Sequence, residues 1–323
     1  MTSLWWDTLP PDLAAPIGAP LPGDTDADVA IVGAGYTGLW TAYALLAADP
    51  TLRIALIEAN VAGYGASGRN GGWASAFFPV SLDQLARHSS RDAAVRLQRA
   101  MHDTVDEIGR TAAREGWDIE WAKGGSVEAA RTPLQLERAR EHVRAARDWG
   151  FGPEDLSLLT ASEARAHANA TDTVGGTFTP HCAAIHPARL VRHLARTVVG
   201  RGARLFEHTT ATAIEPGVVR TDAGSVRAPI IVRATEGYTR SLAGERRTLA
   251  PVYSLMIATE PLPDDVWSEI GMPDRETFHD GRNLIIYAQR TADGRLAFGG
   301  RGAPYGYGSR ITAEQDDCLL YTS

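Results

Sequence analysis

Apolar positions near the N-terminus follow the order strand, helix, strand. Residues 29–32 form a short, β-branched apolar run, and residues 53–57 form a second one. Such continuous apolar runs are typical of buried parallel strands. Residues 39–47 between them are rich in Ala and Leu, which favours a helix. The pattern therefore predicts a βαβ unit.

The later hydrophobic spacing predicts alternating helices and strands. A Pro-rich, extended segment is expected over residues 1–27, and Ser162 is the expected cap of a short helix ending at His167. Asp293-Gly294 between two β-like runs indicates a hairpin. Helices are expected over 81–121, 132–149 and 188–199, and strands over 175–179, 203–206, 210–214, 218–221, 230–233, 254–259, 283–288 and 295–299.

Three glycines follow the first predicted strand in a G-x-G-x-x-G pattern. Gly33 allows a tight turn, Gly35 lets the backbone approach a pyrophosphate, and Gly38 lets helix and strand pack closely. Glu58 ends the second strand about 20 positions later, where an acid accepts hydrogen bonds from ribose hydroxyls. The order predicts a dinucleotide site. The motif alone does not separate FAD from NAD, and a glycine-rich turn that binds nothing is the alternative.

A second glycine-rich stretch, residues 63–73, favours FAD. Its sequence is Gly-Tyr-Gly-Ala-Ser-Gly-Arg-Asn-Gly-Gly-Trp. Such a run exposes backbone N–H groups and permits positive φ, so it can wrap a further polar part of a ligand. Ser67, Arg69 and Asn70 add donors. An NAD enzyme has no need for this loop directly after the ribose acid.

These motifs resemble the FAD-dependent D-amino-acid oxidase superfamily. Within it, the motifs resemble in particular the glycine oxidase, sarcosine oxidase and gamma-glutamylputrescine oxidoreductase branch. It rests on residues 33–38, Glu58, residues 65–72 and Ala234-Thr-Glu-Gly-Tyr-Thr239, and residues 4–9 resemble the putrescine-oxidoreductase-like members. The resemblance implies FAD, and non-covalent binding is expected because no Cys or His stands at a defensible position for covalent flavin attachment. The cofactor residues it implies are Gly33, Ala34, Gly35, Tyr36, Thr37, Gly38, Glu58, Ala59, Gly65, Ala66, Ser67, Arg69, Asn70, Gly71, Gly72, Ala211, Thr235 and Gly237.

The resemblance also implies an α/β fold. An FAD-binding, Rossmann-like domain of the glutathione-reductase type would be interleaved with an α+β substrate domain on an antiparallel sheet. The FAD domain would comprise residues 28–80 and 180–250, with helices on both faces of its parallel sheet. The substrate domain would comprise residues 81–179 and 251–300. Residues 301–323 would begin a truncated return to the FAD domain, and the tail at 318–323 resembles non-native adapter sequence.

Composition removes several other classes of protein. A net charge of −7 and a pI of about 5.7 argue against a nucleic-acid surface. Cys182 and Cys318 do not suggest a disulfide framework, and the nine histidines show no metal-ligand spacing. No secretory signal or apolar run of membrane-spanning length is evident, so a cytoplasmic location is expected.

The resemblance implies oxidation of a C–N bond of an amine or amino acid to an imine, with oxygen or another acceptor reoxidising the flavin. Such chemistry needs binding and orientation more than an acid or base, and no catalytic group is singled out. Candidates on the substrate side are Trp73, Tyr253 and Arg301, with Tyr287 more easily explained by sheet packing and His186 by helix entry. Two alternatives remain: a flavin-binding fragment without turnover, because the sequence ends early, and an NAD-dependent dehydrogenase.

Overall fold

The computed structural model describes residues 3–301, which divide into two compact units. The first contains the chain up to Asn70 and Pro187–Val252, and the second contains Gly71–His186 and the described chain from Tyr253. The sequence analysis divides the chain after residues 80, 179 and 250; which unit serves cofactor or substrate stays a prediction. Residues 302–323, with the expected return segment and non-native tail, lie outside the described residues.

A four-stranded parallel sheet forms the centre of the first unit, in the order β13-β2-β3-β9. Every residue of β2 and β3 is buried, as their apolar sequences predict. The expected strands are confirmed, with bounds β2 Val29–Val32, β3 Ile54–Ile57, β9 Arg204–Phe206 and β13 Ile230–Arg233.

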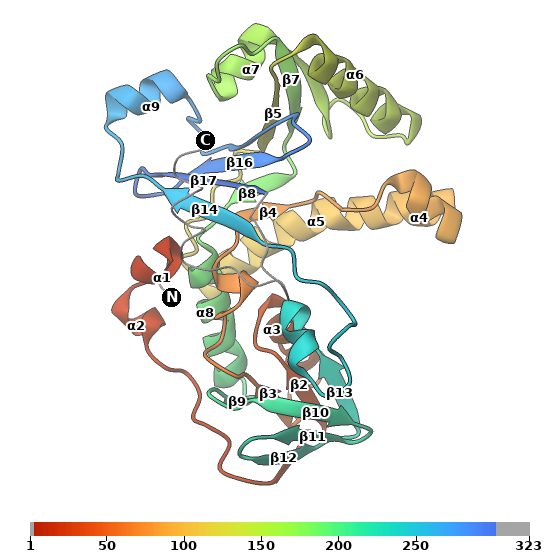
Figure 1. Cartoon of the computed structure of the whole chain (residues 1–323), viewed down its shortest axis with the longest axis vertical. Helices are drawn as coiled ribbons and strands as arrows, with labels where there is room; N and C mark the ends of the chain where they lie inside the picture. Colours follow the sequence, from red (N-terminus) through yellow and green to blue (C-terminus); the bar gives the residue numbers. More distant parts are fainter. Residues whose placement is uncertain (1–2, 302–323) are drawn as a thin grey trace. The chain divides into compact units, whose positions relative to one another are not determined.

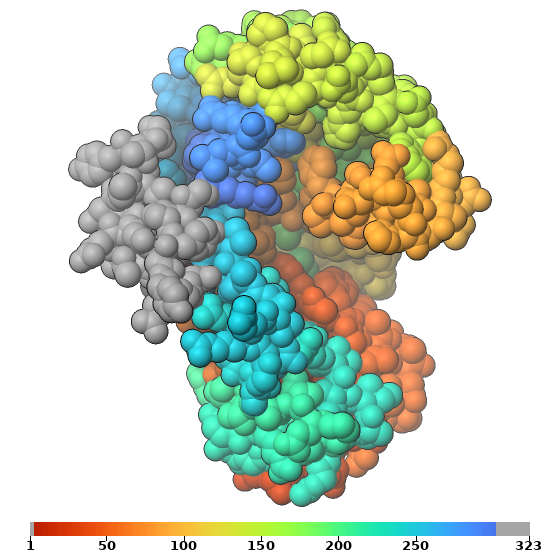
Figure 2. All heavy atoms as spheres, turned by 45° about the vertical axis from the view of Figure 1, so that its right-hand side comes forward, coloured from red at the N-terminus to blue at the C-terminus, as the bar shows by residue number. Residues whose placement is uncertain are grey.

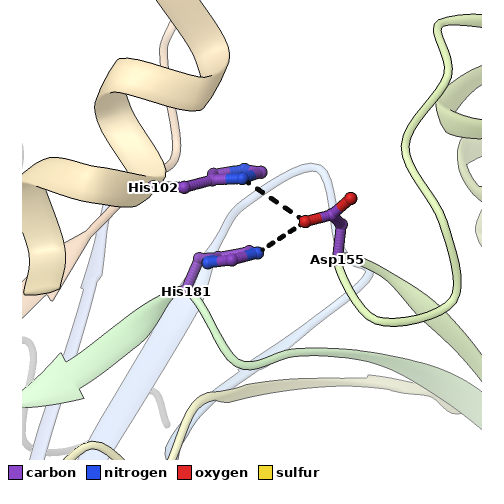
Figure 3. Close-up of side chains that lie close together, drawn as sticks. All are labelled: His102, Asp155 and His181. Carbon is purple, nitrogen blue, oxygen red and sulfur yellow. Dashed lines mark hydrogen bonds and ion pairs between the residues drawn. The ribbon is translucent and has the colours of Figure 1, made fainter.

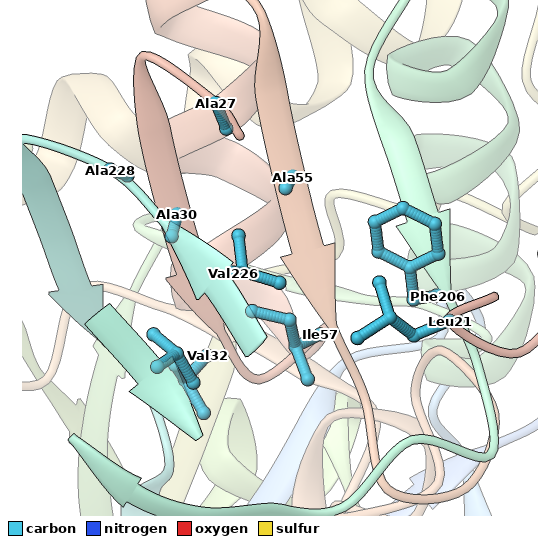
Figure 4. Close-up of a cluster of buried hydrophobic side chains, with 10 residues drawn as sticks. Leu21, Ala27, Ala30, Val32, Ala55, Ile57, Phe206, Val226 and Ala228 are labelled. Atoms are coloured by element: carbon cyan, nitrogen blue, oxygen red, sulfur yellow. The ribbon is translucent and has the colours of Figure 1, made fainter. Parts of the chain in front are cut away.

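Different layers cover the two faces of this sheet. The helix α3 (Tyr36–Ala48) packs against β2 and against α8 (Pro187–Gly200) (Figure 1). The opposite face packs on a second sheet, and Figure 4 shows side chains of both sheets in one buried cluster. The expectation of helices on both faces is therefore wrong, because Val219 and Val226 fill the place of a helix. This sheet contains β1 Thr25–Asp26, β12 Gly224–Arg227, β11 Val218–Thr221 and β10 Ala211–Glu215.

The expected extended N-terminal segment is wrong in part. Two single helical turns, α1 (Leu4–Asp7) and α2 (Pro11–Ala14), occur within it. Pro11 occupies the first position of α2, where its missing N–H costs nothing. Trp5 and Leu13 are buried, so tertiary packing outweighs the weak helical preference of these short segments.

The second unit is built on a seven-stranded sheet, in the order β14-β17-β16-β15-β5-β7-β6. Its neighbours are antiparallel except for the parallel pair β15 and β5, so the expected antiparallel sheet has one parallel pair. The bounds are β5 Ser126–Ala130, β6 Ser157–Thr160, β7 Gly175–Thr179, β14 Ser254–Ala258, β15 Thr277–Asp280, β16 Ile286–Arg290 and β17 Leu296–Arg301, with a separate pair β4 Trp73–Ser75 and β8 Cys182–Ala184.

Capping residues set several helix boundaries of this unit. The helix expected over 81–121 is interrupted before Ser90, which caps α5, and ends before Gly116, whose φ is +69°. Thr160 caps α7 in a capping box, so the assignment to Ser162 is wrong. Figure 2 shows the surfaces of α4 (orange) and α6 (yellow-green). The bounds are α4 Leu82–His88, α5 Arg91–Glu115, α6 Pro133–Asp148, α7 Ala161–His167 and α9 Asp264–Ile270.

Candidate cofactor site

The turn from β2 into α3 is built so tightly that its glycines cannot be replaced without movement. Gly33 has a φ of +107°, and a Cβ atom on it would lie 2.3 Å from the Ala234 carbonyl oxygen. A Cβ atom on Gly38 would lie 2.0 Å from the Gly33 carbonyl oxygen. Gly35 is the N-cap residue of α3, whose N-terminus carries a partial positive charge. The turn therefore exposes bare backbone at a place suited to a pyrophosphate.

Glu58 lies beside this turn at the end of β3. Its Oε2 accepts a hydrogen bond from the Ala34 N–H and its Oε1 accepts one from the Asn60 N–H, both at 3.0 Å. Burial raises the pKa of Glu58 above its usual value, and these N–H groups oppose that rise. Each carboxylate oxygen has two lone pairs, so both can accept a further bond from a ribose hydroxyl. The residues present thus fit a dinucleotide.

The structure brings the second glycine-rich stretch against the first turn. The Gly63 N–H donates to the Ala34 carbonyl at 3.0 Å, and the Tyr36 N–H donates to Ser67 Oγ at 2.9 Å. A 3-10 turn, η1 (Ala66–Gly68), follows, and the Asn70 side-chain amide donates to its Ala66 and Ser67 carbonyls. Ser67 and Asn70 therefore shape the loop itself.

Other predicted residues of this loop and turn have exposed or stacked side chains. The Arg69 guanidinium lies 4.2 Å from the centre of the Tyr64 ring. Thr37, Ala59 and Ala66 are exposed. Their role in holding the cofactor stays a prediction.

The segment after β13 closes on the same turn. The Ala234 N–H donates to the Val32 carbonyl at 2.8 Å, and Thr235 bonds Thr239 through their hydroxyls at 2.7 Å. Gly237 lies in the 3-10 turn η2 (Glu236–Ser241). The sequence analysis missed Tyr238, which approaches so closely that a Cβ atom on Gly65 would lie 3.1 Å from its ring. Its position directly after Gly237 in the matching motif was the available signal.

Ala211 lies apart from these contacts, in the second sheet of the first unit, which contains β1, β12, β11 and β10. It begins β10 and pairs with Thr221 of β11. Its approach to an adenine ring stays a prediction.

The second unit holds the end of the glycine-rich stretch and the substrate-side candidates. The Gln289 side-chain amide, fully buried, donates to the Gly71 carbonyl at 2.6 Å. A Cβ atom on Gly72 would lie 1.9 Å from Gln289 Nε2, and one on Gly71 would lie 3.0 Å from the Tyr287 ring. Tyr287 and Gln289 point to one face of β16, since alternate residues share a face. Gly71 and Gly72 lie on that face.

Trp73 belongs to an aromatic group on the same unit. Its ring meets the Tyr287 ring edge-on at 5.9 Å and the His279 ring at 6.1 Å. Burial lowers the pKa of His279 to about 4, so this imidazole is neutral at pH 7. Burial raises the pKa of Tyr287. The sequence analysis missed His279 and Gln289, because neither stands in a motif.

Tyr253 and Arg301 lie at one end of the β14–β17 pair. Tyr253 directly precedes β14, whose first residue Ser254 pairs with Arg301. Arg301 is exposed and donates its backbone N–H to Ile285. His186 is buried, directly precedes α8, and donates its backbone N–H to the Ile119 carbonyl; its part in helix entry stays a prediction.

A separate polar group in the second unit consists of His102, Asp155 and His181 (Figure 3). His181 Nε2 lies 2.9 Å and His102 Nδ1 3.5 Å from the same Asp155 oxygen. They border a cavity of about 270 Å³ whose other walls come mainly from apolar side chains. Among residues 3–301 this is the group whose ligand atoms lie close enough to share a metal ion.

The geometry favours hydrogen bonds over metal chelation at this group. The two imidazole rings are stacked with centres 3.6 Å apart and planes 7° from parallel, so one ion cannot lie in both ring planes. The Gln98 side-chain amide donates to the Ala76 carbonyl and contacts His102 Nε2 at 3.1 Å, which places the imidazole proton on Nδ1, facing Asp155. Burial, followed by the proximity of His181, lowers the pKa of His102 to about 4.

Comparison with known proteins identifies a family of FAD-dependent enzymes, in agreement with the dinucleotide-binding geometry of the first unit. A family model described as FAD dependent oxidoreductase matches residues 28–321. The chain is 28% identical over 309 residues to a probable oxidoreductase of Haemophilus influenzae, covering 92% of this chain and 69% of that protein. It is 31% identical over 286 residues to the gamma-glutamylputrescine oxidoreductase of Escherichia coli, covering 86% of this chain and 65% of that protein.

Solved structures share the fold at lower identity. Glycine oxidase from Geobacillus kaustophilus matches with a TM-score of 0.67 and 24% identity, covering 92% of this chain and 76% of that one. L-proline dehydrogenase from P. horikoshii matches with a TM-score of 0.68 and 17% identity, covering 93% and 76%. Among residues 3–301, no helix combines the length and hydropathy needed to cross a membrane.

Proposed function

Because this chain belongs to the FAD-dependent oxidoreductase family, we propose that it oxidises a C–N bond of a small amine or amino acid. The observation that carries the proposal is the joined site of the first unit, where Ser67 links the second glycine-rich loop to the turn at Gly35 and Glu58 stands beside them. The similarity to gamma-glutamylputrescine oxidoreductase supports an amine as the substrate class. FAD is the cofactor of the family, so the NAD-dependent alternative is not carried forward.

The proposed roles of the residues follow from their contacts. FAD, when bound, supplies the hydride acceptor. The bare backbone of the β2–α3 turn holds the pyrophosphate, and Glu58 accepts from the ribose hydroxyls. Trp73, whose ring contacts the rings of Tyr287 and His279 in the second unit, is a proposed substrate-side residue. Arg301 is the proposed partner of a substrate carboxylate.

The substrate must react with a neutral nitrogen, because the nitrogen lone pair assists the departure of hydride from the neighbouring carbon. An alkyl ammonium with a pKa near that of lysine, about 10.4, is mostly charged at pH 7. Oxygen or another electron acceptor reoxidises the flavin in this proposal.

Anaerobic reduction of the purified flavoprotein tests the function. A panel of amines, amino acids and hydroxy acids is mixed with the protein, and the loss of flavin absorbance is followed against pH. We expect reduction by an amine, with a rate that rises as pH approaches the pKa of the bound amine. Faster reduction by hydroxy acids than by every amine, or a rate independent of pH in the alkaline range, would contradict the proposal.

A variant separates cofactor binding from chemistry. Gly35→Val puts a branched side chain where even a Cβ atom would lie 2.9 Å from Ser67 Oγ, so the purified variant should lack flavin absorbance. The wild-type protein should be yellow. Wild-type protein that binds NADH and no flavin would overturn the cofactor assignment.

A further inference from the structure

The Trp-Trp pair at the N-terminus contacts the second glycine-rich loop directly. Trp5 is 4% exposed, and its indole Nε1–H donates to the Asn70 carbonyl at 2.9 Å. The next residue, Trp6, lies so near the loop that a Cβ atom on Gly68 would be 3.0 Å from its indole nitrogen. The helix α1 therefore packs against residues 68–70 of the loop.

A fully buried ion pair ties the segment after α1 to the start of the same loop. Arg192 and Glu207 are both 0% exposed and lie 3.2 Å apart. Glu207 Oε2 accepts hydrogen bonds from the Ile17 and Gly18 N–H groups at 3.0 Å each. Arg192 Nε donates to the Leu13 carbonyl at 2.8 Å.

The same pair holds both backbone groups of Ala62. Glu207 Oε1 accepts from the Ala62 N–H at 2.8 Å, and Arg192 donates to the Ala62 carbonyl at 3.2 Å. The next residue, Gly63, donates its N–H to the Ala34 carbonyl. A continuous series of hydrogen bonds thus links the N-terminal segment to the turn that receives the pyrophosphate.

We propose that residues 4–18, with the Arg192–Glu207 pair, form a clasp that positions the loop at 62–70 for the cofactor. Trp5, Arg192 and Glu207 are positioning residues in this proposal, since each acts through the backbone of the loop. The inference rests on the FAD site proposed above. It assigns a role to the motif at residues 4–9, which the chemistry of C–N oxidation does not use.

Trp5→Phe tests the clasp, because it keeps an aromatic ring but removes the indole donor together with part of the buried ring volume. Trp267→Phe is the matched control: Trp267 is buried, and its Nε1–H donates to the Gly294 carbonyl at the same distance of 2.9 Å, in the second unit. Hydrogen exchange of peptides from 62–70 is measured in the apoprotein, and FAD dissociation constants are measured by flavin fluorescence. Loss of one hydrogen bond predicts exchange that is faster and FAD binding that is weaker by about three- to tenfold.

The two measurements separate the clasp from the cofactor assignment. Faster exchange and weaker binding in Trp5→Phe, with neither in Trp267→Phe, support the clasp. Exchange at 62–70 that is unchanged, or unaltered FAD affinity in spite of faster exchange, overturns it. Wild-type apoprotein that does not bind FAD overturns the assignment of the site, while the exchange arm still reports on the contact between Trp5 and the loop.

Glu207→Gln provides a second variant. The amide oxygen of the glutamine can still accept some of the backbone N–H bonds that Glu207 accepts. Arg192, however, would stay buried without a carboxylate partner, which costs stability. If the variant folds, exchange should rise at both 13–18 and 62–70. A rise at only one of these segments contradicts a shared clasp. If it does not fold, the comparison of Trp5→Phe with Trp267→Phe decides the question.

Discussion

At the residue scale, the proposed role of Glu58 predicts that the FAD affinity depends on pH. Burial raises the pKa of this carboxyl above its usual 4.5, so acidification protonates it earlier than an exposed glutamate. Protonation removes acceptor capacity toward the ribose hydroxyls. The FAD affinity of the wild type should therefore fall as pH decreases toward that raised pKa. Fluorescence titrations at a series of pH values measure it, and Glu58→Gln should show a flatter profile over the same range.

The strength of the same contact can be measured at neutral pH. Charge-assisted hydrogen bonds contribute roughly 1.5–3 kcal/mol each. Glu58→Ala should weaken FAD binding by about tenfold to a hundredfold, because about 1.4 kcal/mol corresponds to tenfold. An unchanged dissociation constant would remove Glu58 from the site.

Gly38 allows a matched test of close packing. In Gly38→Ala the new Cβ atom would lie 2.0 Å from the Gly33 backbone oxygen, so α3 or the turn must shift. We expect a loss of unfolding free energy of about 1–3 kcal/mol, together with weaker FAD binding. In Gly200→Ala, at the end of α8, the Cβ atom meets nothing within 4 Å, so stability should be kept or slightly increased. Denaturant unfolding of both variants checks the difference.

At the element scale, the β16–β17 hairpin depends on one glycine. Gly294 has a φ of +80°, and its carbonyl accepts from the Leu262 N–H and the Trp267 indole. Gly294→Ala would strain the turn and should lower the unfolding free energy by about 1 kcal/mol. Thermal unfolding of the variant measures this effect. No change in stability would show that the hairpin tolerates a side chain at this position.

The elements also show which boundaries a sequence can predict. Asp293-Gly294 indicates the hairpin because the turn needs positive φ and both flanking runs are β-like. The cap of α7 was misplaced because Thr160 and Ser162 are both suitable capping residues, and only the reciprocal bonds of Thr160 and Glu163 decide between them. Pro11 and Leu13 do not indicate a helix by themselves, since a single turn as short as α2 is weakly stable without the burial of Leu13.

At the scale of the whole molecule, the cofactor should stabilise the protein by mass action. FAD at about 100 times its dissociation constant adds roughly 2.7 kcal/mol to the unfolding free energy of whatever part binds it. Differential scanning calorimetry with and without FAD should show a raised Tm for the wild type. Gly35→Val should show no such shift. A shift of equal size with NADH would contradict the choice of cofactor.

The sequence by itself determined the parts of the molecule that are local. Apolar runs predict the two strands and the helix of the βαβ unit. The backbone of the turn at residues 33–38 requires glycine at Gly33 and Gly38, and Glu58 follows at the expected spacing. The resemblance to FAD-dependent oxidoreductases follows from these motifs, and the family match over residues 28–321 confirms it. Such features can be read because their residues are neighbours in the chain.

Only the tertiary structure decided which distant residues meet. The hydrogen bond from Trp5 to Asn70 joins residues 65 positions apart, and the one from Gln289 to Gly71 joins residues 218 positions apart. Val219 and Val226 pack against residues of a different sheet. Arg192 and Glu207 carry no motif, and their charges alone would predict exposed side chains. They are buried because folding brings the backbone groups of residues 13–18 and 62 around them, and hydrophobic periodicity carries no information about such partners.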